Sequence, residues 1–128
     1  MTTEFRIRRQ VRYVEDGIVD ELDFAVPRDL AYFAGHFEGW PVLPAVAQLA
    51  ALVVPQVARL YPELGRLRRA ARLKFSRPIA PGDELRLRIH VRTDERLKPV
   101  RAGEVRFTLA REGEVVSSGV LEYEVPGA

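Results

Sequence analysis

Residues 34–50 read AGHFEGWPVLPAVAQLA, and the expected fold follows from this segment. Two glycines and two prolines fall within ten residues, which predicts irregular backbone from Gly35 to Leu43 and a helix whose first residue is Pro44. From Pro44 to Leu60 the chain is almost wholly apolar. Because a helix that is apolar nearly all round must be covered by other elements, we expect a sheet curled around one central helix.

Alternation of polar and apolar residues predicts antiparallel strands on both sides of this helix in the sequence. Two strands precede it and four follow it, at residues 5–13, 18–26, 66–77, 83–95, 100–111 and 114–125. The turn signals between them are Glu15-Asp16-Gly17, Pro81-Gly82-Asp83 and Arg111-Glu112-Gly113. Pro55 lies inside the helix and predicts a kink or break between Ala51 and Pro55. The expected class is α+β, with one apolar and one wet face on the sheet.

Length and composition predict a single domain over residues 1–128. The content of 47% hydrophobic and 30% charged residues is typical of an ordinary globular protein. There are no cysteines, so disulfides and thiolate metal sites are excluded, and we expect neither a metal nor a cofactor. The first residues lack the pattern of a signal peptide, and the longest apolar run is too interrupted to span a membrane. A cytoplasmic protein that binds neither membrane nor, at a net charge of +2, nucleic acid is expected.

Two motifs in order carry a resemblance to a known family. The first is Gly35-His36-Phe37, Gly39, Pro41 and Leu43-Pro44 with the helix after them, and the second is KFSRPIAPGDEL at residues 74–85. Together they resemble the FabA/FabZ-type 3-hydroxyacyl-acyl-carrier-protein dehydratases, and VAQL at residues 46–49 is most similar to the ApeI-like branch. The resemblance covers Asp20 to Val125. It implies a hotdog fold paired into a dimer, with an acyl tunnel at the interface and the histidine and acid of each site on opposite chains.

The resemblance also implies a chemistry. Removing water from a 3-hydroxyacyl thioester needs a base for the alpha proton, a donor for the departing hydroxyl and stabilisation of the enolate. By analogy His36 is the base, and backbone N–H groups near Val42 to Ala45 bind the carbonyl. The helix acid of the family is replaced by Ala50, fourteen positions after the histidine. Glu38 stands where the family usually has proline and is the tentative substitute acid, and Ala45 replaces the usual glycine.

Aromatic residues around the histidine have two interpretations. They line an acyl tunnel, or they pack in the core and the subunit interface. The full set of expected substrate contacts is Tyr32, Phe33, Phe37, Trp40, Val42, Leu43, Ala45, Gln48 and Ala50. Gln48 is expected to hydrogen-bond substrate or a partner chain, whereas His90 lies on the polar face of a strand and is expected to be exposed.

A cationic stretch also has two interpretations. Its members, with no acid among them, are Arg66, Arg68, Arg69, Arg72, Lys74 and Arg77. They form a solvated face, or they dock acyl carrier protein, which is acidic and carries a phosphopantetheine arm.

Three functions therefore remain open at the level of sequence. The first is a working dehydratase of fatty-acid, aryl polyene or polyketide-type synthesis, acting on acyl thioesters. The second is a non-catalytic subunit that binds acyl chains or carrier protein, or that completes a mixed dimer with a hotdog paralogue. The third is a thioesterase, which also usually needs a carboxylate, so Ala50 counts against it. Fold alone does not distinguish them.

Overall fold

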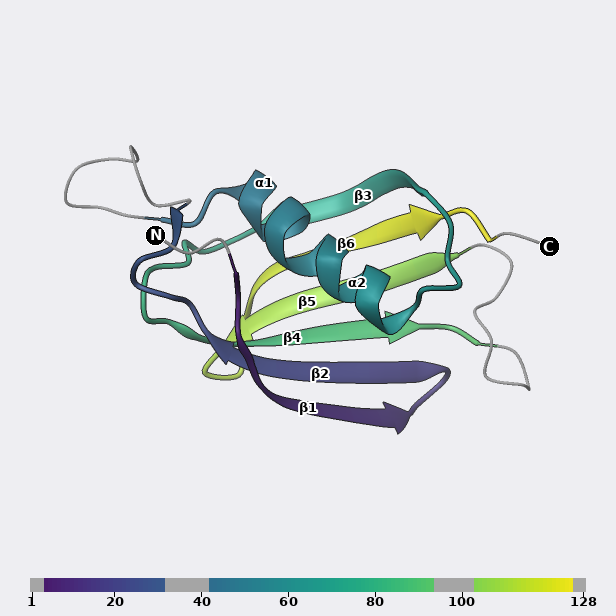
Figure 1. Ribbon diagram of the computed structural model, residues 1–128, viewed down its shortest axis with the longest axis horizontal. Helices are drawn as coiled ribbons and strands as arrows, with labels where there is room; N and C mark the ends of the chain where they lie inside the picture. Colours follow the sequence, from purple (N-terminus) through teal and green to yellow (C-terminus); the bar gives the residue numbers. More distant parts are fainter. Residues whose placement is uncertain (1–3, 32–41, 94–102, 126–128) are drawn as a thin grey trace.

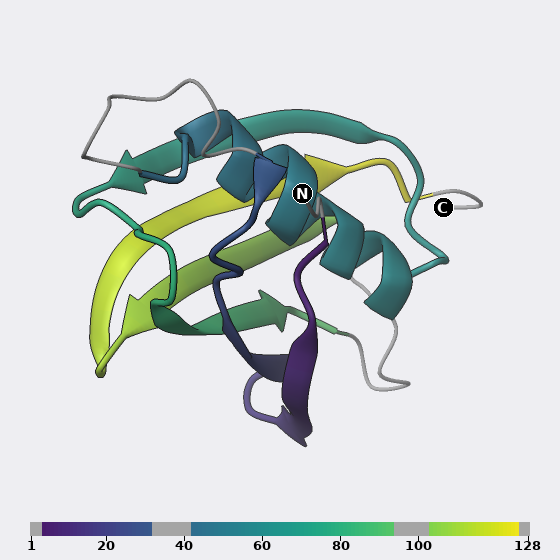
Figure 2. The same cartoon turned by 60° about the vertical axis from the view of Figure 1, so that its left-hand side comes forward.

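The structure is a computed structural model and describes residues 4–31, 42–93 and 103–125. Six antiparallel strands form one sheet, in the order β1-β2-β4-β5-β6-β3. Their bounds are β1 Ile7–Val14, β2 Ile18–Ala25, β3 Leu67–Phe75, β4 Glu84–Val91, β5 Glu104–Arg111 and β6 Glu114–Tyr123. The number of strands and their places along the chain agree with the prediction. The helical segment lies across one face of the sheet (Figure 1), which curves around it (Figure 2).

Two of the predicted turns have backbone that only particular residues adopt easily. Between β1 and β2, Asp16 and Gly17 have φ values of 50° and 114°. Between β5 and β6, Glu112 and Gly113 have φ values of 51° and 78°. Positive φ at both residues of the two-residue loop Glu112-Gly113 suits a tight hairpin because it matches the twist of the flanking strands, and the β1–β2 loop has three residues. The hairpins thereby set the strand registers on which the sheet's two faces depend.

The alternation predicted for the strands is present. In β4, Leu85, Leu87, Ile89 and Val91 are buried against the helix side, and the residues between them lie on the outer face. Arg86 on that outer face pairs with Asp23 of β2, with Nε 2.7 Å from Oδ1. Alternate residues of each strand therefore face opposite sides of the sheet, one set forming the core and the other the solvated surface.

The central helix runs from Ala45 to Leu60 as three joined segments. These are α1 (Ala45–Ala47), the π-helix η2 (Gln48–Val53) and α2 (Val54–Leu60). Pro44 is the N-cap residue with extended backbone, at φ −60° and ψ 149°, and not the first helical residue as predicted. The irregularity predicted near Pro55 takes the form of a π-helix that ends two residues before it. A widened turn accommodates a residue that lacks an N–H donor without ending the helix.

The sheet buries one side of this helix. Ala47, Gln48, Leu52, Val53 and Val57 are buried against it. On the other side, Val46 is 71% exposed, and Ala45, Ala50, Pro55 and Ala58 are also exposed. The expectation of a helix covered all round is thus wrong for the described part of the chain, since six strands of one chain cover a single face. An apolar helix face is left at the surface of the described residues.

One carboxylate lies within the core. Asp20 of β2 is 0% exposed and accepts two hydrogen bonds from Arg12, at 2.8 Å from Nε and 3.1 Å from Nη2. Tyr61, directly after the helix, donates its hydroxyl to the same carboxylate at 3.3 Å. Burial and the neighbouring Asp20 charge raise the pKa of the Tyr61 hydroxyl. The cluster ties β1, β2 and the end of the helix together.

No helix among the described residues is long and apolar enough to cross a membrane.

Candidate active site

The described ends of the two sequence motifs meet around one hollow. Its volume is about 290 Å³, and its walls are Val42, Leu43, Pro44, Ala45 and Gln48 on one side and Phe75, Ser76, Arg77 and Pro78 on the other. The first wall is the entry to the helix, and the second is the end of β3 with the residues after it. A backbone hydrogen bond joins the two segments, since the N–H of Leu43 donates to the carbonyl of Ile79 at 2.7 Å.

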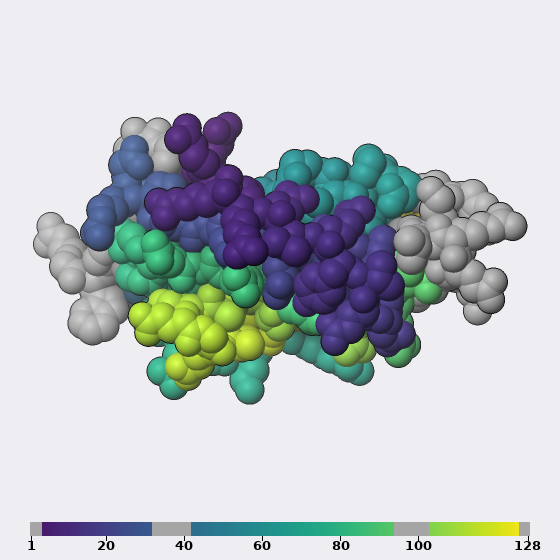
Figure 3. All heavy atoms as spheres, turned by 90° about the horizontal axis from the view of Figure 1, so that it is seen from below, coloured from purple at the N-terminus to yellow at the C-terminus, as the bar shows by residue number. Residues whose placement is uncertain are grey.

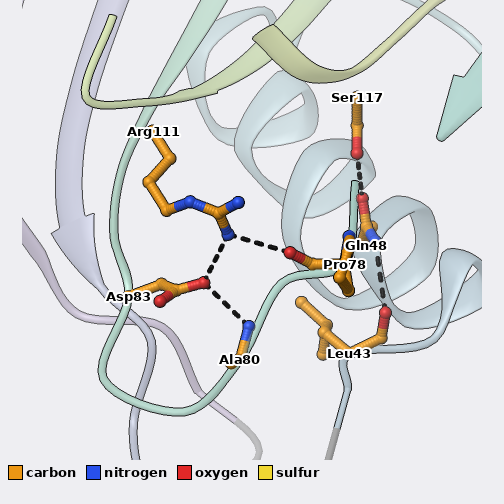
Figure 4. Close-up of polar contacts among 7 residues, drawn as sticks. All are labelled: Leu43, Gln48, Pro78, Ala80, Asp83, Arg111 and Ser117. Atoms are coloured by element: carbon orange, nitrogen blue, oxygen red, sulfur yellow. Dashed lines mark hydrogen bonds and ion pairs between the residues drawn. The ribbon is translucent and has the colours of Figure 1, made fainter. Parts of the chain in front are cut away.

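Gln48 anchors the first wall from inside the core. Its Nε2 donates to the carbonyl oxygen of Leu43 at 3.2 Å, and its Oε1 accepts from the hydroxyl of Ser117 at 2.6 Å (Figure 4). All three residues are buried. A buried polar side chain needs hydrogen-bond partners, and the Gln48 amide has one at each end. The entry to the helix is therefore fixed to strand β6.

Arg111 and Asp83 hold the second wall. The Nη1 of Arg111 donates to the carbonyl of Pro78 at 2.8 Å and to Oδ2 of Asp83 at 2.7 Å. That same carboxylate oxygen accepts from the backbone N–H of Ala80 at 2.8 Å (Figure 4). Sequence reasoning treated Arg111 and Asp83 only as turn residues. The available signal was a carboxylate after Pro81-Gly82, where an aspartate commonly bonds to nearby backbone N–H groups.

The start of the helix, at Pro44 and Ala45, lines this hollow and has no side-chain cap. The N-cap residue Pro44 provides no side-chain hydrogen bond, and no acidic residue lies in the first turn. The first N–H groups of a helix have no partner inside the helix and carry a partial positive charge. Ala45, which carries one of them, lines the hollow and is exposed, and Val46 beside it is also exposed. This geometry suits an anion or a polarised carbonyl oxygen.

The described lining of the hollow contains no carboxylate. Ala50 lies in η2 on the exposed side of the helix, so an acidic side chain there would project from the surface left open by the sheet. The histidine itself falls outside the described residues, together with five other candidates. These six are Tyr32, Phe33, His36, Phe37, Glu38 and Trp40. Their roles stay predictions.

The cationic stretch lies along β3, the edge strand opposite β1. Arg77 pairs with Glu114 at 2.7 Å and Arg66 with Glu124 at 3.4 Å. The other members are exposed, and none of them is ion-paired with a described carboxylate: Arg68, Arg69, Arg72 and Lys74. One edge of the sheet therefore presents four uncompensated positive charges within the described part of the chain.

A second hollow, of about 420 Å³, is lined by residues of β1, β2, β4 and the β5–β6 hairpin. Figure 3 shows the face on which the N-terminal segment, β4 and the hairpin lie side by side. Four of its charged residues pair with one another, Arg86 with Asp23 at 2.7 Å and Arg8 with Glu84 at 3.4 Å. The described residues contain no group of three or more His, Cys, Asp or Glu that would hold a metal. His90 is half-buried on the outer face, with Nε2 2.9 Å from the carbonyl oxygen of Asp16.

Comparison with solved structures identifies the fold class. An uncharacterized protein from Erwinia carotovora subsp. atroseptica superposes with a TM-score of 0.74 at 27% identity, and the match covers 98% of each chain. The dehydratase heterocomplex ApeI:P from Xenorhabdus doucetiae gives a TM-score of 0.66 at 22% identity, covering 90% of this chain and 97% of that one. The structural neighbours are hotdog-fold proteins, which confirms the predicted fold class.

Sequence comparison gives the family within that class. Residues 14–120 match the family model described as ApeI-like, ApeI dehydratase. The 3-hydroxyacyl-acyl-carrier-protein dehydratase FabZ of Herpetosiphon aurantiacus is 26% identical over 127 residues, covering 94% of this chain and 87% of that protein. The chain belongs to the ApeI-like dehydratase family.

Proposed function

We propose that the protein is a 3-hydroxyacyl-acyl-carrier-protein dehydratase, acting in the cytoplasm in fatty-acid, aryl polyene or polyketide-type synthesis. One observation carries the proposal: the described ends of both motifs of the dehydratase resemblance line one hollow, at a helix start without a side-chain cap. A hollow with free backbone donors on one wall suits a thioester carbonyl, whose oxygen gains negative charge as the alpha proton leaves.

In this proposal each step of the reaction has a candidate group. His36 takes the alpha proton, the backbone N–H groups at Ala45 and Val46 stabilise the enolate oxygen, and the 3-hydroxyl leaves with a proton as water. Glu38 or a bound water supplies that proton in place of the absent helix acid. The remaining candidates, Tyr32, Phe33, Phe37 and Trp40, contact the acyl chain.

Acyl carrier protein docks on the cationic edge in the same proposal. The four exposed cations of β3 that lack a described ion-pair partner support this, because an acidic partner gains most from charges that are not already neutralised. Arg77 lies at the hollow and on the cationic stretch, where the phosphate of a phosphopantetheine arm would pass.

The test is dehydration of a carrier-bound 3-hydroxyacyl thioester by the purified protein, followed from the appearance of the conjugated alkene. His36→Ala should lower kcat by about 10² to 10⁴-fold, as loss of a general base does. The matched control is His90→Ala, on the outer face of β4, which should leave kcat unchanged. Ala50→Asp, which restores the family's acid, should raise it. Turnover that survives His36→Ala would refute the proposed site, and release of free thiol without alkene would indicate a thioesterase.

A second candidate is a subunit of a mixed complex in which an acid-bearing homologue completes the site. Two observations favour it. The described lining lacks a carboxylate, and β3 is an edge strand with Leu73 40% and Phe75 37% exposed. A free edge beside exposed apolar side chains pairs readily with another chain. The structural neighbour ApeI:P is itself a dehydratase heterocomplex.

Co-expression with acid-bearing hotdog homologues, followed by copurification and sedimentation, separates the two candidates. A mixed dimer that turns over while the isolated protein does not would support the second candidate. A homodimer with full activity would exclude it.

A further inference from the structure

The buried amide of Gln48 connects the sheet to the wall of the hollow. Gln48 is the one glutamine among the described residues that is fully buried, and its position at the start of the π-helix faces β6. A buried amide is costly unless it is hydrogen-bonded, and both ends of this one are engaged, by Ser117 at 2.6 Å and Leu43 at 3.2 Å. Its orientation is therefore fixed by the chain itself.

The effect of this contact falls on the two peptide groups that flank Leu43. The carbonyl on one side accepts from Gln48, and the N–H on the other donates to Ile79. The next residues, Pro44 and Ala45, begin the helix and line the hollow. Gln48 ties the helix entry to strand β6 through Ser117 (Figure 4). Ile79 ties the same entry to the segment after β3.

We propose that Gln48 and Ser117 are positioning residues of the dehydratase site, which set the orientation of the helix entry without contacting the reacting atoms. This inference rests on the proposed function. The backbone N–H groups at Ala45 and Val46 must point at an oxygen whose charge develops in the transition state, and such stabilisation depends steeply on geometry. Carrier-protein docking uses other residues. The Ser117–Gln48 contact therefore determines kcat and leaves KM nearly unchanged.

The experiment uses paired substitutions that separate positioning from stability. Gln48→Met removes the amide at nearly equal length, Ser117→Ala removes the hydroxyl, and the double variant removes both partners. Gln48→Met leaves the Ser117 hydroxyl and the Leu43 carbonyl without their partner, whereas the double variant leaves only the Leu43 carbonyl and should be more stable than Gln48→Met. Gln56→Met is the matched control, since Gln56 is on the same helix and its side chain accepts a hydrogen bond from Arg59 at the surface.

We expect kcat to fall by up to about 10²-fold in Gln48→Met and to stay low in the double variant, although its melting temperature recovers. KM should be unchanged in these variants, and Gln56→Met should have the kcat of the wild type. Recovery of kcat together with stability would show a merely structural role and overturn the inference, as would unchanged kcat in Gln48→Met.

Amide hydrogen exchange of residues 42–48, measured on the same variants, covers the case of an inactive wild type. No turnover by the wild type refutes the proposed function. Faster exchange in Gln48→Met than in Gln56→Met would then still support the positioning contact, and equal exchange would overturn it.

Discussion

At the scale of single residues, the best defined polar contact outside the hollow is the one that Asp20 makes. Sequence alternation already gives a signal for it, since Asp20 shares the parity of Leu22 and Phe24, whose side chains face the core. The β1–β2 register sets Arg12 directly opposite Asp20. A hairpin centred on Asp16 would have predicted that pair. The third member, Tyr61, is 41 residues away in sequence and emerges only from the packing of the helix.

Replacing Arg12 tests how much this contact stabilises the fold. Arg12→Met should lower the free energy of unfolding by about 2 to 3 kcal/mol, because Asp20 is left as a buried charge with one weak donor. The matched control is Arg86→Met, whose partner Asp23 is 31% exposed and stays solvated, so its loss should be below about 1 kcal/mol. Urea unfolding of the two variants measures the difference. Equal losses would mean that water reaches Asp20.

At the scale of elements, β3 departs from a regular strand. Its register with β6 shifts twice, between Leu67 and Arg69 and between Ala71 and Lys74. In the second shift Arg72 has φ of 52°, a left-handed conformation that a side chain adopts at a cost. The bulge directs Leu73 over Gly119, which has no side chain. A Cβ atom added at Gly119 would lie 2.6 Å from Leu73 Cδ2. The irregular edge strand is thus packed on β6 and is not merely frayed.

Substituting glycine at the bulge tests this strain. Arg72→Gly should leave the free energy of unfolding unchanged or raise it by up to about 1 kcal/mol, since glycine adopts positive φ without a steric penalty. Arg69→Gly, in the same strand but at a paired position opposite Glu122, is the control and should lose about 0.5 to 1 kcal/mol. Thermal unfolding of both variants gives the comparison. A loss at Arg72 as large as that at Arg69 would contradict the bulge.

The sequence predicted the elements better than their surroundings. Strand periodicity located all six strands, and the two hairpin turns followed from their glycines, because both signals are local. The exposure of Val46 and Ala50 was not predictable from the apolar pattern of the helix. Such a pattern indicates that a side chain avoids water, but it does not indicate which element covers that side chain. The networks around Gln48 and Arg111 also escaped prediction, since each joins residues that are distant in sequence. For the candidate site, both motifs were identified from sequence, but the meeting of their described ends and the buried contacts that hold them emerged only from the structure.

At the scale of the whole molecule, ion pairs connect the strands across the outer face. The Asp23–Arg86 pair joins β2 to β4 with two hydrogen bonds, of 2.7 and 3.0 Å. Hydrogen bonding to Arg86 lowers the pKa of Asp23 below its ordinary value of 3.8. A carboxyl group with a lowered pKa in the folded state stabilises the fold above its unfolded pKa, and this contribution is lost as pH falls through the folded value.

The acid dependence of stability tests this pair. Asp23→Asn should be less stable than the wild type by about 0.5 to 1 kcal/mol at pH 7, with the difference shrinking as pH falls from about 3.8 through the lower pKa of folded Asp23. Glu84→Gln is the control, because its carboxylate is 80% exposed and should contribute little at any pH. Chemical unfolding at pH 7 and pH 3 measures both. A difference as large at pH 3 as at pH 7 would assign the effect to packing instead of charge.

The strand order has a consequence for how the chain folds during synthesis. Strand β3 precedes β4, β5 and β6 in sequence, yet β6 is the only strand with which it pairs in the described structure. On a ribosome, residues 67–75 therefore have no strand partner until the last strand has emerged. The helix before them likewise has neither Ser117 as a partner for Gln48 nor the core residues of β5 and β6 to pack against. Closure of the sheet waits for the C-terminal strand, so nascent chains that stop before residue 114 should bind chaperones and resist compaction.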